Sequence, residues 1–350
     1  MKRKITVGVL FGGRSAEHEV SLRSARTVVS AIDPEKYSVV LIGVDKVGRW
    51  FLGDSSQKLL QSSEIAYGET SSNVALTPTG KDKKLFNLAT GTEVSGIDVL
   101  FPVLHGPYGE DGTVQGLAKL ANVACVGAGV LGSAVGMDKD VMKRLLRDAG
   151  IAIGKFITIT KTTRSHFSYD AVSKELGAVV FVKPANLGSS VGVAKASSQA
   201  EFDQAVETAF KFDRKVIVEE FINGREIECA VLGNDQVEAS IPGEIVPHAD
   251  FYSYDAKYAA SSQSECKIPA NLSDTEIKLV QDLAKKTFAT LECRGMARVD
   301  FFYTQDKQLL VNEINTIPGF TSISMYPKMW EASGKPLNEL VDELIELAIE

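Results

Sequence analysis

The chain has 350 residues, a formal net charge of -7, no run of lysine and arginine, and no apolar stretch long enough to span a membrane. These features argue against nucleic acid or a membrane as the principal partner and favour small-molecule chemistry in two or three compact units. The four cysteines are scattered without a close pair, which indicates a reduced cytoplasmic setting rather than disulfides or zinc. The first four residues run directly into an apolar strand pattern, so we expect no secretory leader.

The N-terminal segment predicts a strand, a turn and a helix. Residues 5–11 form an apolar run, Gly12 and Gly13 follow it, and apolar residues then recur at helical spacing. A glycine pair before a helix usually favours an anion, yet Glu17 and Glu19 occupy the first turn. They can simply complement the helix dipole, or Glu17 can face a cationic group of a substrate. The glycine pattern is too weak for a dinucleotide fingerprint.

Two further buried strands are predicted, at residues 37–44 and 98–104, and they indicate a parallel sheet with crossing helices. The polar stretch 53–92 between them looks dispensable. His105 opens a glycine-rich loop at the carboxyl end of the second strand, where open α/β sheets bind ligands. It can bind a phosphate, move a proton or only cap nearby backbone. Glu110 is expected to cap the following helix.

The next part of the chain contains two lysines in positions that suit an anion. Residues 137–149 predict a helix, and Lys139 in its first turn opposes the helix dipole, so it is either solvated or reaches an anion. A strand at 179–182 leads into Lys183 and the serine and glycine loop 186–195. Small residues leave N–H groups free to cradle a phosphate, although the loop lacks Walker spacing and an exposed turn is the alternative.

The following segment offers candidates for contacts with a nucleoside. A strand at 216–221 carries Glu219, which can meet a nucleobase, and Glu226 beyond it can meet a ribose. Taken singly, both are ordinary strand-end glutamates. The long loop 247–269 is rich in aromatic residues, and loops of that length are usually disordered or functional, so we predict a lid.

The most informative stretch is 298–319, where two apolar runs joined by a polar turn predict a β-hairpin. Alternation places Arg298 and Asp300 on one face, and Glu313 and Asn315 on one face of the partner strand. The faces coincide if the chain turns near residues 305 and 306. Two carboxylates and an amide gathered in this way suit Mg²⁺ with bound phosphates. A half-exposed hairpin with its polar face in water is the alternative.

In their joint order and spacing, these motifs resemble one family, the D-alanine:D-alanine ligases of the ATP-grasp superfamily. The resemblance covers nearly the whole chain, and any single motif alone is weak. The matching motifs are GGRSAEHEVSLRSA, HGPYGEDGTVQG, MDK, FVKPANLGSSVGV, EEFINGREIECAVL, PGEI, FYSYDAKY, ARVDFF and NEINTIPGFTSISMYP.

The resemblance implies an ATP-grasp fold of three α/β domains, with ATP in the cleft between the central and C-terminal ones. The N-terminal parallel-sheet domain would span 1–130, the central domain with the serine loop 131–221, and the C-terminal domain with lid and hairpin 222–350. It also implies ADP-forming ligation of two D-alanines through D-alanyl phosphate, for peptidoglycan precursors. The enzyme would be a cytoplasmic homodimer with neither nucleic acid nor membrane as partner.

Matching residue by residue, the resemblance implies ATP contacts in three groups. Adenine would be framed by Glu219, Phe221 and Ile222, with Glu226 on the ribose. The phosphates would be held by the lysines and the serine loop, namely Lys139, Lys183, Gly188, Ser190 and, from the lid, Lys257. Two Mg²⁺ ions, which Mn²⁺ can replace, would be ligated by Asp300, Glu313 and Asn315.

For the D-alanine site, the resemblance gives each residue a different role. Glu17 would meet the ammonium of the first D-alanine, in a network with Ser189 and Tyr258. Arg298 and the Gly319 N–H would hold the tetrahedral oxyanion. His105 would orient the second substrate or manage its proton. The carboxylate of the second substrate would be positioned by Arg298 and Ser324.

The resemblance also bears on specificity. The related depsipeptide ligases replace Tyr258 or rebuild the lid, so its presence favours D-alanine over D-lactate as second substrate. Ser253, where many members carry an acid, is a small departure that affects only local lid packing. The alternatives are a ligase making D-Ala-D-Lac or D-Ala-D-Ser, and a nucleotide-binding regulator without turnover. A nicotinamide-dependent oxidoreductase is disfavoured, because GGRSAE lacks the third glycine.

Overall fold

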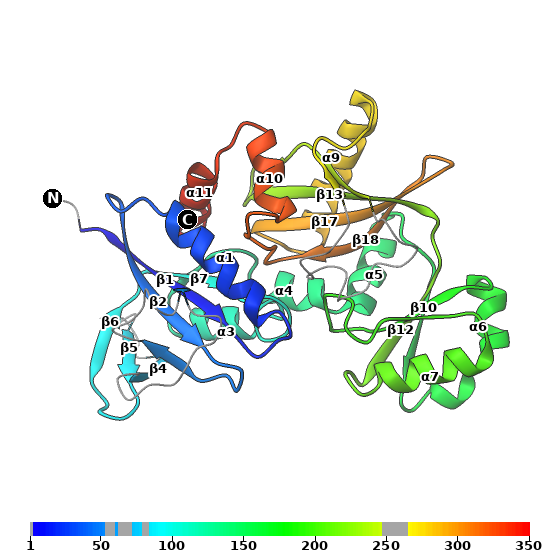
Figure 1. Ribbon diagram of the computed structural model, residues 1–350, viewed down its shortest axis with the longest axis horizontal. Coiled ribbons are helices and arrows are strands. Elements are labelled where there is room, and N and C mark those ends of the chain that lie inside the picture. The colour runs from blue at the N-terminus through cyan, green and yellow to red at the C-terminus, as the bar shows by residue number, and fades with distance from the viewer. Residues whose placement is uncertain (1–2, 53–59, 62–71, 79–83, 247–264) are drawn as a thin grey trace.

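The computed structural model describes residues 3–52, 60–61, 72–78, 84–246 and 265–350. Three β-sheets follow one another along the chain, with eight, four and six strands. Figure 1 shows the first sheet at one end of the molecule, the second at the other end and the third between them. The α/β architecture expected from the sequence is therefore present. The domain boundaries at residues 130 and 221 stay predictions.

One half of the first sheet is parallel, as predicted. Its four parallel strands are β2 (Tyr37–Val44), β1 (Ile5–Gly12), β7 (Val99–Val103) and β8 (Ala124–Cys125). Alternate side chains of β1 enter different cores: Val9 and Phe11 pack with α1 (His18–Ala31), whereas Leu10 packs with α3 (Thr113–Leu120). Because β1 and β7 are parallel, the loops that follow them lie together at the carboxyl ends of the strands, which is where ligands bind in such folds.

The first sheet continues into an antiparallel extension that the sequence analysis missed. Its strands are β3 (Trp50–Leu52), β4 (Ser72–Leu76), β5 (Lys84–Asn87) and β6 (Glu93–Gly96). Val74, Leu76 and Leu85 are buried there, so the stretch 53–92 is not dispensable throughout. Each strand is short and apolar only at alternate positions, which makes its pattern hard to distinguish from a polar loop.

The second sheet is antiparallel and covered by helices on one face. Its strands are β11 (Ala194–Ala196), β10 (Val180–Pro184), β12 (Lys215–Glu220) and β9 (Phe156–Thr160). The one-turn helix η1 (Arg164–His166) and helices α6 (Tyr169–Leu176) and α7 (Gln199–Ala209) complete this part of the chain. Val182 and Val218 pack against α6 and α7, so alternation places Lys183 and Glu219 on the opposite face.

The third sheet is also antiparallel and carries the predicted hairpin. Its strands are β16 (Glu265–Lys267), β15 (Gly243–Val246), β13 (Gly224–Gly233), β17 (Gly295–Thr304) and β18 (Leu309–Asn315), with β14 (Val237–Ala239) paired to β13. One face packs on α5 (Lys139–Asp148), which follows α4 (Val130–Met137), and on α9 (Asp274–Thr290). Ser273 and Glu276 form a capping box at the start of α9.

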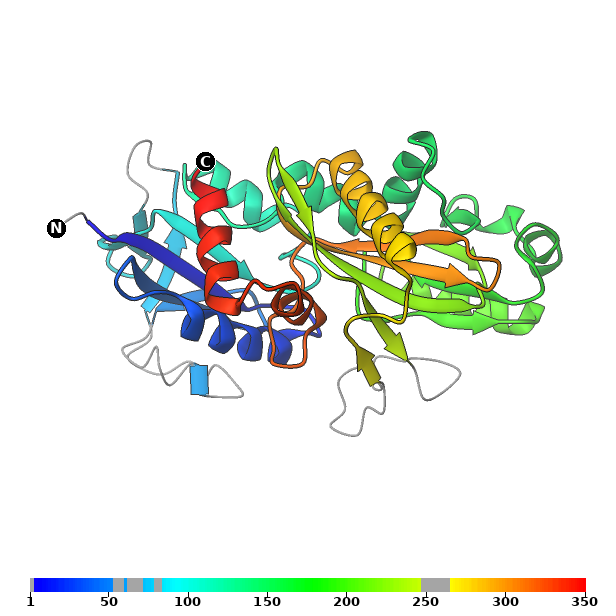
Figure 2. The same cartoon turned by 90° about the horizontal axis from the view of Figure 1, so that it is seen from above.

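One apolar core joins the third sheet to the first. It contains α10 (Met325–Ala332), which packs on β13, and α11 (Leu337–Ile349), which lies against α1 and the first sheet in Figure 2. Phe320 is its link, because its ring lies 6.2 Å from that of Phe101 on β7 and 5.6 Å from that of Tyr326 on α10. The chain that follows β18 is therefore anchored between two sheets.

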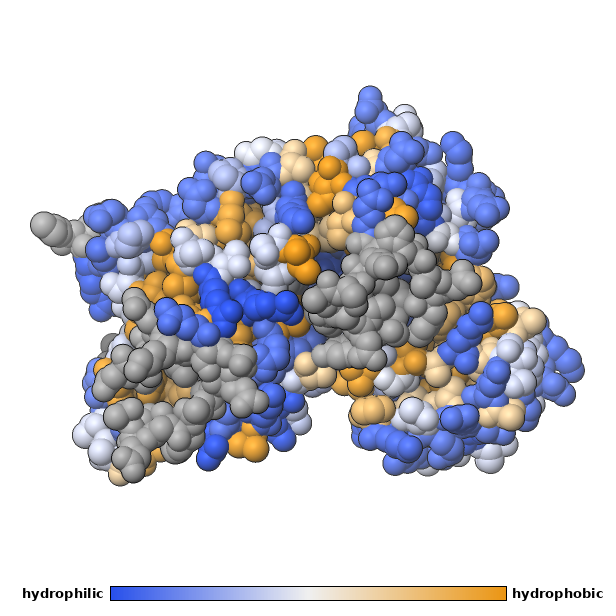
Figure 3. Space-filling view, viewed as in Figure 1, coloured by the Kyte–Doolittle hydropathy of each residue, from blue (hydrophilic) through white to orange (hydrophobic). Residues whose placement is uncertain are grey.

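The outer surface is mixed in character. Hydrophilic residues cover much of the face shown in Figure 3, and hydrophobic residues form scattered patches on it. Among the helices in the described ranges, none combines the length and the apolar character needed to cross a membrane.

Candidate functional site

A β-bulge brings the polar groups of the hairpin to one face. Near the turn Phe302 pairs with Leu310, but beyond a bulge between Asp300 and Phe301 the register shifts and Asp300 pairs with Glu313. Without that shift Asp300 would face Asn312, and Glu313 would point to the opposite, apolar side. The predicted shared face is present, but the bulge produces it rather than the expected turn position alone.

Arg298 links the carboxylates on this face. Its guanidinium donates to both carboxylate oxygens of Asp300, each at 2.7 Å, and its Nε lies 3.1 Å from Glu228 Oε2. Asn315 Nδ2 donates to Asp300 at 2.9 Å. Burial alone would lower the pKa of Arg298, but the Asp300 and Glu228 carboxylates hold it well above its usual value. Sequence reasoning missed Glu228, although alternation on β13 places it on the same face as Glu226.

The oxygen donors on the hairpin fit a magnesium site shared with a substrate. Asp300, Glu313 and Asn315 supply two carboxylates and one amide, which is too few for an all-protein cage. Magnesium keeps several waters and substrate phosphates in such sites, so this donor set suits it. Lys139 Nζ lies 3.3 Å from Glu313 Oε2, which places a phosphate-binding candidate beside the donors.

Two lysines on facing elements pair with Glu219, and a third lies one helical turn away. Lys143 Nζ lies 2.8 Å from one carboxylate oxygen of Glu219, and Lys183 pairs with the other. Burial alone would raise the pKa of Glu219, but these two lysines lower it to about 2. Lys139 donates at 2.8 Å to the carbonyl of Leu187, at the start of the serine loop. Lys143 was missed, although it lies one helical turn after Lys139 on the same face of α5.

The serine loop adopts an unusual backbone and approaches Glu17. Ser189 and Ser190 both have left-handed conformations, with φ of 52° and 59°, which non-glycine residues rarely adopt. A Cβ at Gly188 would lie 3.9 Å from a carboxylate oxygen of Glu17, and one at Gly106 would lie 3.4 Å from it. The structure therefore brings together three motifs that are far apart in the sequence.

The predicted adenine contacts lie where strand β12 of the second sheet ends and the chain passes to β13. Phe221 is half exposed, and its ring centroid lies 6.1 Å from that of Phe181 and 5.9 Å from Lys195 Nζ. Ile222 follows directly, and Glu226 lies on β13 where that strand begins. The Phe221 ring, with the Lys195 ammonium next to it, offers an aromatic surface on which a planar ring can stack.

Glu110 does not cap the helix that follows it, because the N-cap residue of α3 is Gly112, without a side-chain cap. Instead its carboxylate accepts the N–H of Gly106 at 2.7 Å and that of Ile317 at 3.2 Å. Burial and the Glu17 carboxylate raise the pKa of Glu110 to about 8, against the effect of both N–H donors. The carboxylate thus joins the loop after β7 to the chain after β18.

The chain after β18 brings Gly319 and Ser324 together. A Cβ at Gly319 would lie only 2.8 Å from Ser324 Oγ, so a larger residue would displace that hydroxyl. His105 is buried beside this chain, with Nδ1 3.0 Å from the Ile317 carbonyl. Burial lowers the pKa of His105, and Arg298 adds to this effect, whereas Glu17 and the Ile317 carbonyl oppose it.

Two of the predicted residues, Lys257 and Tyr258, lie outside the described residues, as does Ser253. The remaining candidates lie on strands of the second and third sheets, on α5, and on loops, including those beside the first sheet. The lid prediction therefore stays a prediction.

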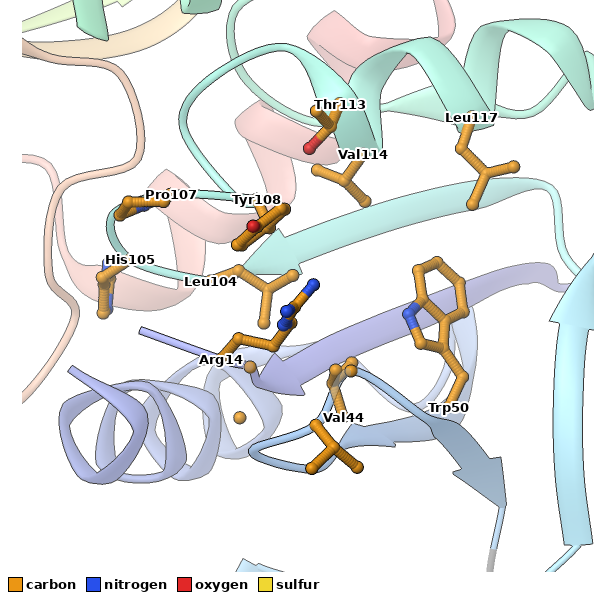
Figure 4. A pocket seen from close by; sticks show the side chains of 14 residues that line it. Arg14, Val44, Trp50, Leu104, His105, Pro107, Tyr108, Thr113, Val114 and Leu117 are labelled. Atoms are coloured by element: carbon orange, nitrogen blue, oxygen red, sulfur yellow. The ribbon is translucent and has the colours of Figure 1, made fainter. Parts of the chain in front are cut away.

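A separate hollow of about 230 Å³ lies at the carboxyl ends of β1 and β7 (Figure 4). Arg14 lies 4.5 Å above the ring of Tyr108, and Leu104 and Trp50 contribute apolar walls. His105 also lines this hollow. It lies at the sheet edge where the sequence predicted ligand binding.

Comparisons with known proteins identify relatives over the whole chain. A family model described as D-ala D-ala ligase N-terminus matches residues 6–128, and one described as D-ala D-ala ligase C-terminus matches residues 145–346. The D-alanine–D-alanine ligase of Oceanobacillus iheyensis is 48% identical, covering 100% of this chain and 96% of that relative. D-alanine–D-alanine ligase A of Escherichia coli K12 is 49% identical, covering 99% of this chain and 96% of that relative.

Solved structures give the same result. The D-alanine–D-alanine ligase of Coxiella burnetii has a TM-score of 0.85 at 41% identity and covers 99% of this chain and 95% of its own. The D-Ala:D-Ser ligase of Enterococcus faecalis has a TM-score of 0.90 at 36% identity and covers 99% of this chain and 100% of its own.

The lysine cluster predicts a large stability difference between neighbouring substitutions on α5. Lys143→Met breaks a buried ion pair, because only 3% of the Lys143 side chain is exposed, and should lower the free energy of unfolding by about 3 kcal/mol. Arg144→Met is the control: its side chain is 54% exposed and its loss should cost under about 1 kcal/mol. Urea denaturation at pH 7 measures both.

The choice of pH matters for this comparison. The folded chain lowers the pKa of Glu219 to about 2. The stabilisation from its charge is therefore complete at pH values above the ordinary glutamate pKa and is lost as the pH falls toward 2. Equal losses for the two variants at pH 7 would contradict the account of a buried pair.

Proposed function

The chain belongs to the D-alanine–D-alanine ligase family, and we propose that it joins two D-alanines with ATP to give ADP, phosphate and D-alanyl-D-alanine for peptidoglycan precursors. The observation that carries this proposal is the polar face of the β17–β18 hairpin. There Arg298, Asp300 and Glu313 lie beside Lys139 among apolar strands. Such an arrangement can hold phosphates on one side and an oxyanion on the other.

On the nucleotide side, Lys139, Lys183 and the serine loop from Gly188 to Ser190 hold the phosphates. Each lysine is paired with a carboxylate and can exchange that partner for a phosphate oxygen. Adenine stacks at the aromatic edge beside Phe221 and Ile222, with Glu219 nearby and Glu226 on the ribose. Lys257 of the lid contacts the phosphates and helps to exclude water.

Asp300, Glu313 and Asn315 are the residues that would hold two Mg²⁺ ions, or Mn²⁺ in their place. A metal ion bound there would supply positive charge to offset that of the transferring phosphoryl group. Before ligands arrive, Arg298 and Lys139 balance the same carboxylates. The protein therefore keeps this face nearly neutral.

On the amino acid side, Glu17 binds the ammonium of the first D-alanine, with Ser189 and Tyr258 in the same network. The carboxylate of this D-alanine accepts the phosphoryl group, and the amine of the second D-alanine attacks the acyl phosphate and displaces phosphate. Arg298 and the Gly319 N–H hold the oxyanion of that attack. Arg298 and Ser324 position the second carboxylate, and His105 lies beside them.

A second candidate specificity also has support. The D-Ala:D-Ser ligase of Enterococcus faecalis has the same fold at a TM-score of 0.90, so the fold alone does not separate D-alanine from D-serine as second substrate. Tyr258 in the lid favours D-alanine over D-lactate.

We also propose a cytoplasmic homodimer. The cysteines, free in the structure, suit a reducing compartment. Leu120, Val130 and Leu131 expose 72%, 39% and 59% of their surface on the touching helices α3 and α4, beside the edge strand β8. A hollow of about 420 Å³ lies between these elements. A second copy of the chain would cover this apolar surface.

Arg298 gives the direct test of the ligation site. Arg298→Ala removes an oxyanion donor and should lower kcat by about a hundredfold or more, while ATP binding is largely retained. Steady-state assays of dipeptide formation and calorimetric titration with a non-hydrolysable ATP analogue measure the two effects. Arg294→Ala is the control, because the Arg294 side chain is 57% exposed on the same segment. Undiminished dipeptide formation by Arg298→Ala would rule out the oxyanion role.

The proposed dimer surface can be tested by charge insertion. Light scattering of the unmodified chain should give twice the mass of 37.8 kDa, and Leu131→Glu should give the single mass, because a carboxylate cannot be buried unpaired at an apolar interface. Leu279→Glu is the control, since Leu279 is 50% exposed on α9, away from α3 and α4. A monomeric unmodified chain, or an unchanged mass for Leu131→Glu, would exclude this surface.

A further inference from the structure

The chain segment 317–320 is held at both ends by the first sheet and its helix. At one end, His105 Nδ1 donates to the Ile317 carbonyl at 3.0 Å. At the other end, the Phe320 N–H donates to Ser24 Oγ at 3.1 Å. Ser24 lies on α1 and is fully buried, and His105 is 5% exposed. Water therefore does not compete for these bonds.

The two holding residues are also joined to each other. Ser24 Oγ lies 3.1 Å from His105 Nε2. Since Ser24 already accepts the Phe320 N–H, its own hydrogen is available to Nε2, and Nδ1 carries the hydrogen donated to Ile317. This single arrangement satisfies every partner with a neutral imidazole, in agreement with the direction in which burial shifts its pKa.

Within the held segment, one amide remains for a ligand. The Ile317 N–H donates to Glu110, Pro318 has no N–H, and the Phe320 N–H donates to Ser24. In the described parts of the chain, no group accepts the Gly319 N–H. Every neighbouring donor is occupied, so the fixed segment presents a single N–H.

We propose that Ser24 is a positioning residue for the ligation: with His105, it fixes the segment 317–320 so that the Gly319 N–H points at the developing oxyanion. This inference rests on the proposed function, which places the tetrahedral oxyanion beside Gly319. His105 then acts through the backbone it holds, since both of its ring nitrogens are engaged. The bonds also connect α1, whose N-terminal side carries Glu17, to the site of the second step.

A nearby serine separates this role from a structural one. Ser21 lies one turn earlier on α1 and is equally buried. It accepts the Gly12 N–H at 2.7 Å and donates to the Val103 carbonyl, and so joins the ends of β1 and β7. Neither of these two bonds reaches the segment 317–320. Ser21→Ala removes a buried hydroxyl without releasing that segment.

The experiment compares Ser24→Ala, Ser24→Thr and Ser21→Ala by kcat, by KM for ATP and D-alanine, and by ADP released per dipeptide. Ser24→Ala should lower kcat about tenfold to a hundredfold with KM for ATP unchanged, because the oxyanion donor is displaced rather than deleted. ADP per dipeptide should rise above one, since water then attacks the waiting acyl phosphate and releases D-alanine and phosphate. Ser24→Thr keeps the hydroxyl and should restore coupling.

Two further comparisons sharpen the test. Ser24→Ala combined with His105→Gln should lose no more rate than the worse single variant, because both release the same segment. Ser24→Cys, of similar size, replaces the alanine variant if the latter does not fold, and thermal unfolding of each variant checks this.

The outcomes distinguish the inference from its premise. Normal kcat and coupling for Ser24→Ala would overturn the positioning role and leave the proposed function in place. Equal uncoupling by Ser21→Ala would show that Ser24 only supports the fold. Failure of the unmodified chain to form D-alanyl-D-alanine would instead overturn the proposed function.

Discussion

The register shift in the β17–β18 hairpin is the constraint on which the site depends. With regular pairing Glu313 would enter the apolar side of the third sheet, where an unpaired carboxylate costs several kcal/mol. The bulge at Asp300 places it beside Asp300 and Lys139 instead. The same register brings Arg298 opposite Asn315. A local irregularity in one hairpin therefore decides whether phosphate-binding and oxyanion-binding groups share a face.

A second feature is that the charges of the site are paired within the chain. Lys139 pairs with Glu313, Lys183 with Glu219 and Arg298 with Asp300. These pairs keep buried charges compensated, and they hold the side chains close to the places where phosphates and carboxylates would bind. Binding then becomes an exchange of partners. The apolar core around Phe320 keeps the two sides of the site at a fixed spacing.

Much of this could be predicted from the sequence, because alternation and turn residues are local signals. The β17–β18 hairpin and the strand β10 that leads into the serine loop are present as expected. Three features could not be found in this way. The strands β4 and β5 are too short to show a clear period. Glu110 has one partner, Ile317, from a distant segment, and Lys143 stood out only once Glu219 was placed opposite it.

The most direct test of the central claim is to identify, by mass spectrometry, the product formed from ATP, Mg²⁺ and D-alanine while ADP release is monitored. Parallel reactions contain L-alanine, or D-alanine with D-serine or D-lactate. The account predicts one ADP for each D-alanyl-D-alanine with D-alanine alone, and D-alanine preferred over D-lactate when both are present. ADP without dipeptide, ligation only with another acceptor, or ATP binding without turnover would contradict it.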